Sequence, residues 1–368
     1  MKEKIGDLTK IKTGKLDANA SSEEGQYPFF TCSREPLKIS SYSYDCECVL
    51  VAGNGDLNVK YYNGKFDAYQ RTYIIEDNGS GKLYMPYLYY FMEGYIEELR
   101  KQAVGGVIKY IKLGNLTDAL IELPSVDEQK AIVDVLDKAK NVLSIRNEEI
   151  SKLDDLIKAR FVEMFGDAVD NPMNWEKKQL QDIVTDDCTI SYGIVQTGDD
   201  QDEGVPVFRP VDIVNRIPKL EELKKTTEEI SNKYKRTILK GREMLITVRA
   251  NIADTCIVGE EFKGCKVGRG IVPIRTKEDI MVLEFLKYLI DSKHLNDDIK
   301  SKAKGITLIQ LNMEDLREVE LIIPPVEQQK SFVEFAKQVD KSKFMERLYY
   351  LYKNFEKKTF SKFYEEVE

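Results

Sequence analysis

The sequence predicts an α+β protein in which two α/β globular domains are separated by two long helices, and the helices form an antiparallel coiled coil with pseudo-two-fold symmetry. Three observations predict this fold: a repeat two hundred positions apart, one apolar stripe on each helical segment, and short alternating apolar runs elsewhere. The expected segments are a first globular domain at 1–122, a helical spacer at 123–167, a second globular domain at 168–322 and a second helical spacer at 323–368.

The repeat is clearest where each globular segment ends. The run ALIELPSVDEQKAIV at 119–133 returns as VELIIPPVEQQKSFV at 319–333. Its identical pairs include Pro124 with Pro324, Gln129 with Gln329 and Lys130 with Lys330. A weaker likeness joins 47–75 to 243–274, where Arg71 and Arg269 occupy similar places. A period this long indicates duplicated domains rather than a solenoid of short repeats.

Each spacer carries the signals of a long amphipathic helix. Ser125 and Glu128 form a capping box after Pro124, and Pro325 can serve as a first-turn proline in the second copy. The first helical run lasts about 38 residues, or about 57 Å. One stripe of that length needs a partner, and the two spacers are natural partners for each other. The alternative is two unrelated helices, each packed on its own domain. The predicted seam consists of Ile132, Val135, Ala139, Leu143, Ile150, Leu153, Ile157, Phe332, Phe335, Val339, Leu348 and Tyr352.

The globular segments show short alternating runs separated by Gly, Asn and Asp, which is typical of strands and turns. The expected strands are Tyr27–Thr31, Cys48–Ala52, Arg71–Ile75, Met244–Val248, Cys256–Val258 and Ile271–Ile274. Helical stretches are expected at Met85–Lys101 and Val282–Lys302.

The composition permits DNA binding without indicating it. The net charge is −8, but the largest acidic excess per residue falls in 121–167, and the globular segments are close to neutral. A DNA reader needs a local basic patch rather than a basic whole. We expect no signal peptide and no membrane span, because no long uncharged apolar run occurs.

Catalytic and metal-binding signatures are missing from the sequence. No phosphate-binding P-loop and no glycine-rich loop suited to a methyl-donor nucleoside occurs. The segment Asn171-Pro-Met-Asn174 lacks the second proline and the aromatic of an amino-methyltransferase motif, so we expect a linker turn there. The six cysteines form no C-x-x-C pair, and His294 is the only histidine. We therefore expect free thiols in a reducing cytosol, no metal site and no catalytic residue.

Side chains suited to DNA recognition cluster in the turns of both globular segments. Arg, Asn and Gln can read base edges bidentately, and Lys and Arg bind phosphates. For any single residue a solvated surface role is the simpler interpretation, so the hypothesis rests on the set. The candidates are Arg34, Lys38, Asn54, Asn58, Lys60, Tyr61 and Arg71 in the first segment, and Gln196, Arg209, Arg249, Asn251, Lys266, Arg269 and Lys304 in the second.

This organisation resembles that of type I restriction–modification specificity (S) subunits. The resemblance is carried by ELPSVDEQKAIVDVLD and LIIPPVEQQKSFVEF, and by the segments YPFFT, VAGNGDLNVKYYNGKFDAYQRT, GREMLITVRANI and NPMNWEKKQLQDIV between them. It covers nearly the whole chain. The first domain begins almost at Met1, without the N-terminal extension of the family pattern.

The resemblance implies a DNA-binding, non-catalytic subunit of a cytoplasmic complex. Each target recognition domain would read one half of a bipartite, asymmetric DNA site through the major groove, and the helices would fix the gap between the halves. Two modification (methyltransferase) subunits would dock on the chain, and restriction (translocase–nuclease) subunits would join through them. S-adenosylmethionine, ATP and Mg would belong to those partners.

Two other classes of function remain as alternatives. One is a coiled-coil scaffold that binds protein or glycan and not DNA, and the other is a free-standing nuclease or methyltransferase. A variant of the main interpretation is a subunit that serves a methyltransferase without a nuclease partner.

Overall fold

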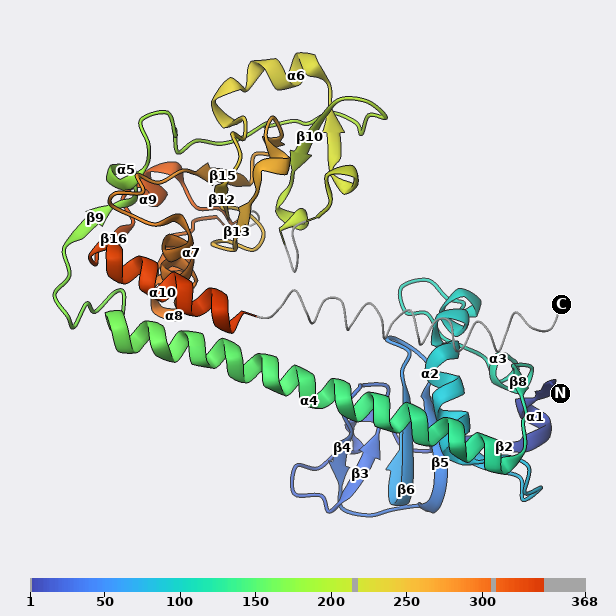
Figure 1. Ribbon diagram of the computed structural model, residues 1–368. Coiled ribbons are helices and arrows are strands. Elements are labelled where there is room, and N and C mark those ends of the chain that lie inside the picture. The colour runs from blue at the N-terminus through green and yellow to red at the C-terminus, as the bar shows by residue number, and fades with distance from the viewer. Residues whose placement is uncertain (1, 214–217, 306–308, 341–368) are drawn as a thin grey trace. The chain divides into compact units, whose positions relative to one another are not determined.

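The computed structural model describes residues 2–213, 218–305 and 309–340. The described residues fall into two compact units, the first ending at Glu148 and the second beginning at Glu149 (Figure 1). All six cysteines are free thiols. No helix in the described ranges combines the length and the apolarity needed to cross a bilayer.

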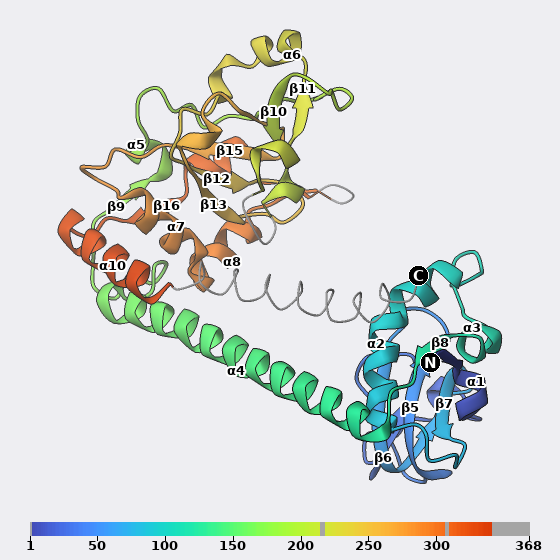
Figure 2. The same ribbon diagram turned by 45° about the vertical axis from the view of Figure 1, so that its right-hand side comes forward.

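A six-stranded sheet forms the centre of the first unit. Its order is β2 (Thr9–Thr13), β7 (Thr72–Asp77), β5 (Tyr44–Ala52), β6 (Val59–Ala68), β3 (Tyr27–Phe30) and β4 (Leu37–Ile39). All neighbours are antiparallel except β3 and β6. Helix α2 (Met85–Gln102) packs on β5 and β6, as Figure 2 shows.

Strand β5 shows why the alternating pattern predicts this sheet. Val49 and Val51 join the core under α2, whereas Cys48 and Leu50 join a separate cluster on the opposite face. Successive side chains of a strand point to opposite faces, so a fully apolar run requires cover on both sides. Both expected elements, the strand at Cys48–Ala52 and the helix at Met85–Lys101, are confirmed.

The second unit is built on two three-stranded sheets. One has β12 (Glu243–Thr247) between β13 (Thr255–Val258) and β15 (Ile271–Ile274). The other has β10 (Val205–Phe208) between β11 (Lys224–Thr226) and β14 (Lys266–Val267). The second unit also holds α6 (Glu228–Lys233), and short 3-10 turns in the two units lie at Ala18–Ala20, Pro210–Asp212, Leu220–Glu222, Lys235–Thr237 and Glu260–Phe262.

The helix expected at Val282–Lys302 is divided. Helix α7 (Leu283–Asp291) and helix α8 (Lys293–Ser301) are separated at Ser292, which has an extended backbone. The Ser292 hydroxyl donates to the Leu289 carbonyl at 2.6 Å, so it satisfies the end of α7. The prediction of one continuous helix is therefore wrong at this residue.

The two units share their entry and exit elements, which confirms the duplication. In the first unit β1 (Lys2–Lys4) pairs with β8 (Leu120–Glu122), and in the second β9 (Lys177–Gln179) pairs with β16 (Glu320–Ile322). Both pairs are antiparallel. Helix α1 (Ile5–Leu8) follows β1 as α5 (Leu180–Ile183) follows β9. Helix α3 (Leu113–Thr117) precedes β8 as α9 (Met313–Arg317) precedes β16.

Helix α4 (Val126–Phe165) begins at the predicted capping box. The Ser125 N–H donates to the Glu128 carboxylate at 2.9 Å, and the Glu128 N–H donates to the Ser125 hydroxyl at 3.4 Å. The Ser125 hydroxyl donates to the Glu128 carboxylate at 2.7 Å, and this bond and the one from the Ser125 N–H hold the pKa of Glu128 below its usual range. In the second copy α10 (Val326–Val339) begins one residue after Pro325, so this proline is the N-cap rather than a first-turn residue.

A buried glutamine fixes each spacer helix to its own domain. Gln129 accepts the Tyr84 N–H at 2.8 Å and donates to the carbonyls of Lys82 at 2.8 Å and Pro124 at 2.9 Å. Gln329 repeats these three bonds: it accepts the Val282 N–H and donates to the carbonyls of Ile280 and Pro324. Both side chains are fully buried. The glutamine of the repeated motif is therefore a structural lock between helix and domain.

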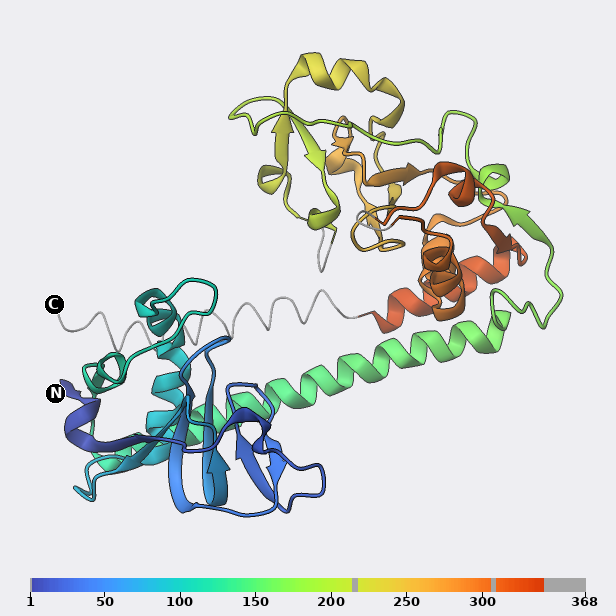
Figure 3. The ribbon, with the colours of Figure 1, turned by 180° about the vertical axis from the view of Figure 1, so that it is seen from behind.

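The last turns of α4 pack antiparallel against α10 within the second unit. The Phe332 ring lies 5.4 Å from that of Phe161 and 5.6 Å from that of Phe165. Further along α10, Phe335 lies under the guanidinium of Arg160, at 5.8 Å. Residues later in the sequence of α10 thus contact residues earlier in the sequence of α4, so the two helices run antiparallel, as Figure 3 shows from behind.

The described residues of the predicted seam differ in burial. Ile157 and Phe332 are buried and Val339 packs beside them, whereas Leu143, Ile150 and Leu153 are half-buried. In the first unit α4 packs on its own domain through Val133 and Leu136, with Ile132 beside them and Ala139 half-buried. Val135 is 53% exposed, because the face of α4 that packs on its own domain passes through its neighbours. Leu348 and Tyr352 lie outside the described residues.

Candidate nucleic-acid interface

The connection between β5 and β6 gathers several of the predicted residues of the first unit. Asp56 accepts hydrogen bonds from Arg34 at 3.1 Å and from Arg100 at 3.0 Å. The hydrogen bond from Arg34 and that from Arg100 hold the pKa of Asp56 below its usual range. Asn58 donates to the Cys32 carbonyl at 2.8 Å and accepts from Lys60, whose burial lowers its pKa. Arg34, Asn58 and Lys60 therefore shape this turn.

A loop after α2 docks on the same turn. Val104 and Tyr110 exchange two backbone hydrogen bonds of 3.0 and 2.9 Å, and they close a hairpin-like loop. The Gly55 N–H donates to the Lys109 carbonyl at 3.1 Å, and Asn54 pairs with Tyr110. At the tip Val107 is fully exposed and Ile108 is 63% exposed. The turn and the loop thus form one exposed end of the unit.

Arg71 reaches this end through the backbone. Its carbonyl accepts the Gly53 N–H at 2.7 Å, and its side chain is exposed. Of the other two candidates, Lys38 lies away from the turn and the side chain of Tyr61 is hydrogen-bonded within the unit. Lys38 is exposed on the edge strand β4, and the Tyr61 hydroxyl donates to Glu47 at 2.7 Å. Partial burial, followed by that hydrogen bond to Glu47, raises the pKa of Tyr61.

Arginines converge at one end of the second unit. The Gly268 N–H donates to the Phe208 carbonyl at 2.8 Å, and the Val248 N–H donates to the Gly270 carbonyl at 2.8 Å. Segment 268–270 therefore lies between the residues that precede Arg209 and Arg249, and it contains the exposed Arg269. A side chain at Gly270 would collide with Pro210, which shows how closely these segments pack.

The remaining polar candidates of this unit surround the arginines. Arg249 donates to the Gln310 side chain, and Gln310 exchanges backbone bonds with Lys304. Lys304 also pairs with Asp315 at 3.3 Å. Arg209 binds Asp212, which raises the pKa of this arginine. The exposed Asn251 lies in the turn after Arg249, and Gln196 is exposed beyond the pairing of Ile194 with Gly268.

Lys266 corrects the predicted set. It is 2% exposed, and its ammonium donates to the Tyr234 carbonyl at 3.0 Å inside the second unit. Burial lowers its pKa. The side chain spans from β14 to this carbonyl instead of pointing outward, so Lys266 is not part of the exposed cationic surface.

Sequence reasoning missed two residues of these two exposed ends. Tyr110 and Gln310 close the two loops. Gln310 could have been found from its place in the repeat, since it lies two hundred positions after Tyr110. Its contact with Arg249 depends on the fold and leaves no signal in the sequence.

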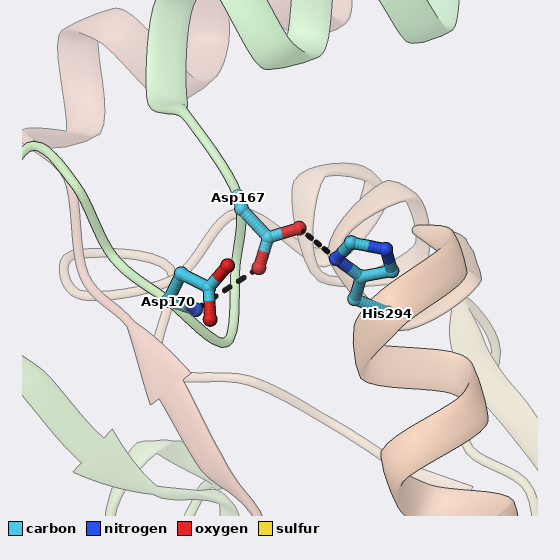
Figure 4. A group of neighbouring side chains, drawn as sticks. All are labelled: Asp167, Asp170 and His294. Carbon is cyan, nitrogen blue, oxygen red and sulfur yellow. Dashed lines mark hydrogen bonds and ion pairs between the residues drawn. The ribbon is translucent and has the colours of Figure 1, made fainter.

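The only histidine takes part in a small polar cluster at the end of α4 (Figure 4). His294 Nδ1 lies 2.6 Å from the Asp167 carboxylate, and the ligand-type atoms of His294, Asp167 and Asp170 lie within 4.8 Å of one another. Burial opposes ionisation of Asp167, but the N–H groups of Asp170 and Val169 and the nearby His294 outweigh it and lower its pKa. We assign this cluster the structural role of joining α4 to α8.

The segment after this cluster forms the predicted linker turn. Asn171 and Asn174 have positive φ angles of 48° and 55°, and the Asn174 N–H donates to the Asn171 carbonyl at 3.0 Å. The Asn171 side chain also binds both backbone groups of Trp175 at 2.9 Å. These are turn contacts, which asparagine supports well.

Comparison with known proteins decides the family. A model of the type I restriction modification DNA specificity domain matches residues 1–155 and again residues 172–358. The chain belongs to this family. Its two matched ranges of specificity domain agree with the duplication of the fold described above.

Relatives and solved structures of the specificity-domain family support the assignment. The EcoDI type I restriction enzyme specificity subunit of Escherichia coli is 45% identical over 133 residues, which are 36% of this chain and 29% of that subunit. The EcoBI specificity subunit of Escherichia coli is 22% identical over 316 residues, or 80% of this chain and 66% of that subunit. The chain thus spans less than two thirds of the length of either relative.

Two solved structures share the fold of this specificity-domain chain. The S subunit of the type I restriction–modification system from M. genitalium has a TM-score of 0.59 and 15% identity, with 95% of this chain and 92% of that chain covered. A chain from a structural study of complex assembly and conformational transition in the type I R-M system has a TM-score of 0.54 and 18% identity, with 98% and 95% covered.

Proposed function

We propose that the chain is the DNA sequence-specificity subunit of a type I restriction–modification complex. Each globular unit reads one half of a bipartite, asymmetric DNA site. The target recognition domains are 1–122 and 168–322, and the helical spacers are 123–167 and 323–368. The spacers set the gap between the two half-sites.

One observation carries this proposal: the same fold occurs twice, with the same locked helix entry and different exposed side chains. Gln129 and Gln329 make equivalent bonds in the two copies. The loop ends differ, with Tyr110 in one copy and Gln310 in the other. Equivalent frames with different polar groups suit the recognition of two different half-sites.

The chemistry of the complex belongs to partner subunits in this proposal. The chain carries no catalytic activity of its own and acts in the cytoplasm. It docks two modification (methyltransferase) subunits, and restriction (translocase–nuclease) subunits join through the complex. S-adenosylmethionine, ATP and Mg are used by those partners. The exposed apolar side chains of α4, such as Val142 and Ile145, offer a surface for docking.

Selection from a randomised duplex library tests the proposal. The chain is co-purified with its modification subunits, and the bound duplexes are sequenced. We expect a motif of two unlike half-sites with a fixed gap, and a shift of the gap by two base pairs should abolish selection. Affinity should fall steeply as salt rises, because phosphate contacts release counterions.

Two results would contradict the proposal. Absence of duplex binding at low salt would favour the protein- or glycan-binding scaffold. Cleavage or methylation of DNA by the purified chain alone, with Mg and S-adenosylmethionine supplied, would favour a free-standing enzyme.

A further inference from the structure

The exposed end of the first unit rests on a set of backbone hydrogen bonds that fix its loops. The Gly53 N–H donates to Arg71 at 2.7 Å, and the Ile111 N–H donates to Gly53 at 2.9 Å. The Tyr69 N–H donates to the Phe30 carbonyl at 2.9 Å. These bonds, with the paired Val104 and Tyr110, place the turn after β5, the segment before β7 and the loop after α2 side by side.

The second unit repeats the same bonds with different residues. The Val248 N–H donates to Gly270 at 2.8 Å, and the Leu311 N–H donates to Val248 at 2.9 Å. The Gly268 N–H donates to the Phe208 carbonyl at 2.8 Å, and Lys304 pairs with Gln310 as Val104 pairs with Tyr110. Leu16 and Ile194 also make equivalent parallel pairings, with Tyr69 and Gly268. The two exposed ends therefore share one pattern of backbone hydrogen bonds, which we call the shared frame.

This shared frame equates residues that the sequence alone does not align. Asn54 follows Gly53 as Arg249 follows Val248, and both pair with the residue that closes the loop. Gln70 stands between Tyr69 and Arg71 as Arg269 stands between Gly268 and Gly270. The match expected between Arg71 and Arg269 is therefore off by one position. Each frame presents two polar side chains at the same places, as amides in the first unit and as guanidiniums in the second.

These four side chains retain hydrogen-bonding capacity. The amides of Asn54 and Gln70 make no hydrogen bond to any described residue, and Gln70 is exposed. Arg269 is exposed, and no carboxylate of the described ranges lies within ion-pair distance of it. Arg249 is held by Gln310, while its Nε has no partner among the described residues. A guanidinium held at one end loses less entropy when it binds, which favours a recognition role over a solvated one.

The chemistry of the two groups selects different bases. An asparagine or glutamine amide matches the N6 and N7 edge of adenine, and an arginine matches the O6 and N7 edge of guanine. We propose that Asn54 and Gln70 select adenine in the half-site of the first unit, whereas Arg249 and Arg269 select guanine in the half-site of the second. This inference rests on the proposed function and adds which class of base each unit requires.

Substitution at the equivalent positions tests the inference in the complex with modification subunits. Arg249→Gln and, separately, Arg269→Gln are compared with the wild type by selection from a library with both half-sites randomised. We expect each variant to lose preference for guanine at one position of one half-site by about tenfold or more, with the other half-site unchanged. Arg269 is exposed, so its variant reports on recognition even where Arg249→Gln disturbs the loop.

Matched controls separate a local effect from a general loss of charge. Arg242 lies at the opposite end of β12 and pairs with Glu284 at 3.1 Å, so Arg242→Gln should leave the selected motif unchanged. Asn54→Arg should raise the preference for guanine in the half-site of the first unit, while Asn63→Arg, at an exposed position of β6, should not.

Three outcomes distinguish failure of the inference from failure of the proposed function. Guanine preference that survives both Arg249→Gln and Arg269→Gln overturns the inference. The inference is also overturned if Asn54→Arg and Arg249→Gln change the base preference in the same half-site. A library that yields no sequence preference with the wild-type complex overturns the proposed function itself.

Discussion

Replacing Gln329 by leucine should destabilise the second unit by about 3–5 kcal/mol. The Gln329 side chain is fully buried, accepts the Val282 N–H at 2.9 Å and donates to the carbonyls of Ile280 at 2.9 Å and Pro324 at 2.7 Å. Leucine makes none of these bonds. Each backbone group left without a partner costs about 1–3 kcal/mol, and the added apolar burial offsets about 1–2 kcal/mol of the total.

Fluorescence of Trp175 provides a local assay for this variant. It is the only tryptophan of the chain, and its indole N–H donates to the Phe165 carbonyl at 3.0 Å, where α4 meets the core of the second unit. Guanidinium titration of the variant should show the Trp175 transition at a clearly lower denaturant concentration than in the wild type.

Gln328 supplies the matched control, because it is the preceding residue of the same helix and is exposed. Gln328→Leu should unfold within about 0.5 kcal/mol of the wild type. If Gln328→Leu and Gln329→Leu unfold at the same guanidinium concentration, the Gln329 amide does not fix the helix to its domain. The structural role inferred for Gln129 and Gln329 is then wrong.

Three further predictions address the helix start, the buried ion pair and the thiols. Ser125→Ala should cost about 1 kcal/mol by thermal circular dichroism, because the two hydrogen bonds between the Ser125 hydroxyl and Glu128 are lost, whereas Ser144→Ala, at an exposed position of α4, should cost little. Arg275→Met should cost about 3–5 kcal/mol, because Glu243 is fully buried and bonded to Arg275 at 2.9 Å, and the double variant with Glu243→Leu should recover most of it; a double variant as weak as the single one would contradict this. Burial raises the pKa of Cys256 to about 12 and that of Cys265 to about 11, so at pH 8 few of these thiols are ionised; mass spectrometry should show slow alkylation in the folded chain and rapid alkylation after unfolding, and equal rates would refute the assigned burial.

Much of the fold could be predicted because local patterns agree with it. The strand at Cys48–Ala52 is apolar at every position and is covered on both faces, and the helix start at Ser125 follows from a capping box. The phase of the spacer helix could not be predicted in the same way. Val133 and Val135 are equally apolar, and only the position of α2 decides that Val133 is buried and Val135 exposed.

The candidate site is harder to predict than the fold, because its residues are far apart in the sequence and come into contact only in the folded protein. Arg249 and Gln310 are far apart in the sequence, and their contact depends on the loop that the paired backbone of Lys304 and Gln310 closes. Residue type also fails to separate a surface lysine from a buried one. The Lys266 ammonium donates a hydrogen bond to the Tyr234 carbonyl, and nothing in the surrounding sequence predicts this bond.

Two lysines therefore provide a direct test of whether burial separates structural lysines from lysines that contact DNA. Lys109 lies in the exposed loop of the first unit and has no ion pair with any described residue, whereas Lys266 is buried. Lys109→Met should lower the slope of log affinity against log salt by about one, because one phosphate contact is lost. Lys266→Met keeps a similar shape without a charge to bury, so it should leave that slope unchanged in filter-binding titrations of the complex. A lower slope for Lys266→Met would mean that its ammonium leaves the core when DNA binds, and the division between structural and DNA-facing cations would then have to be redrawn.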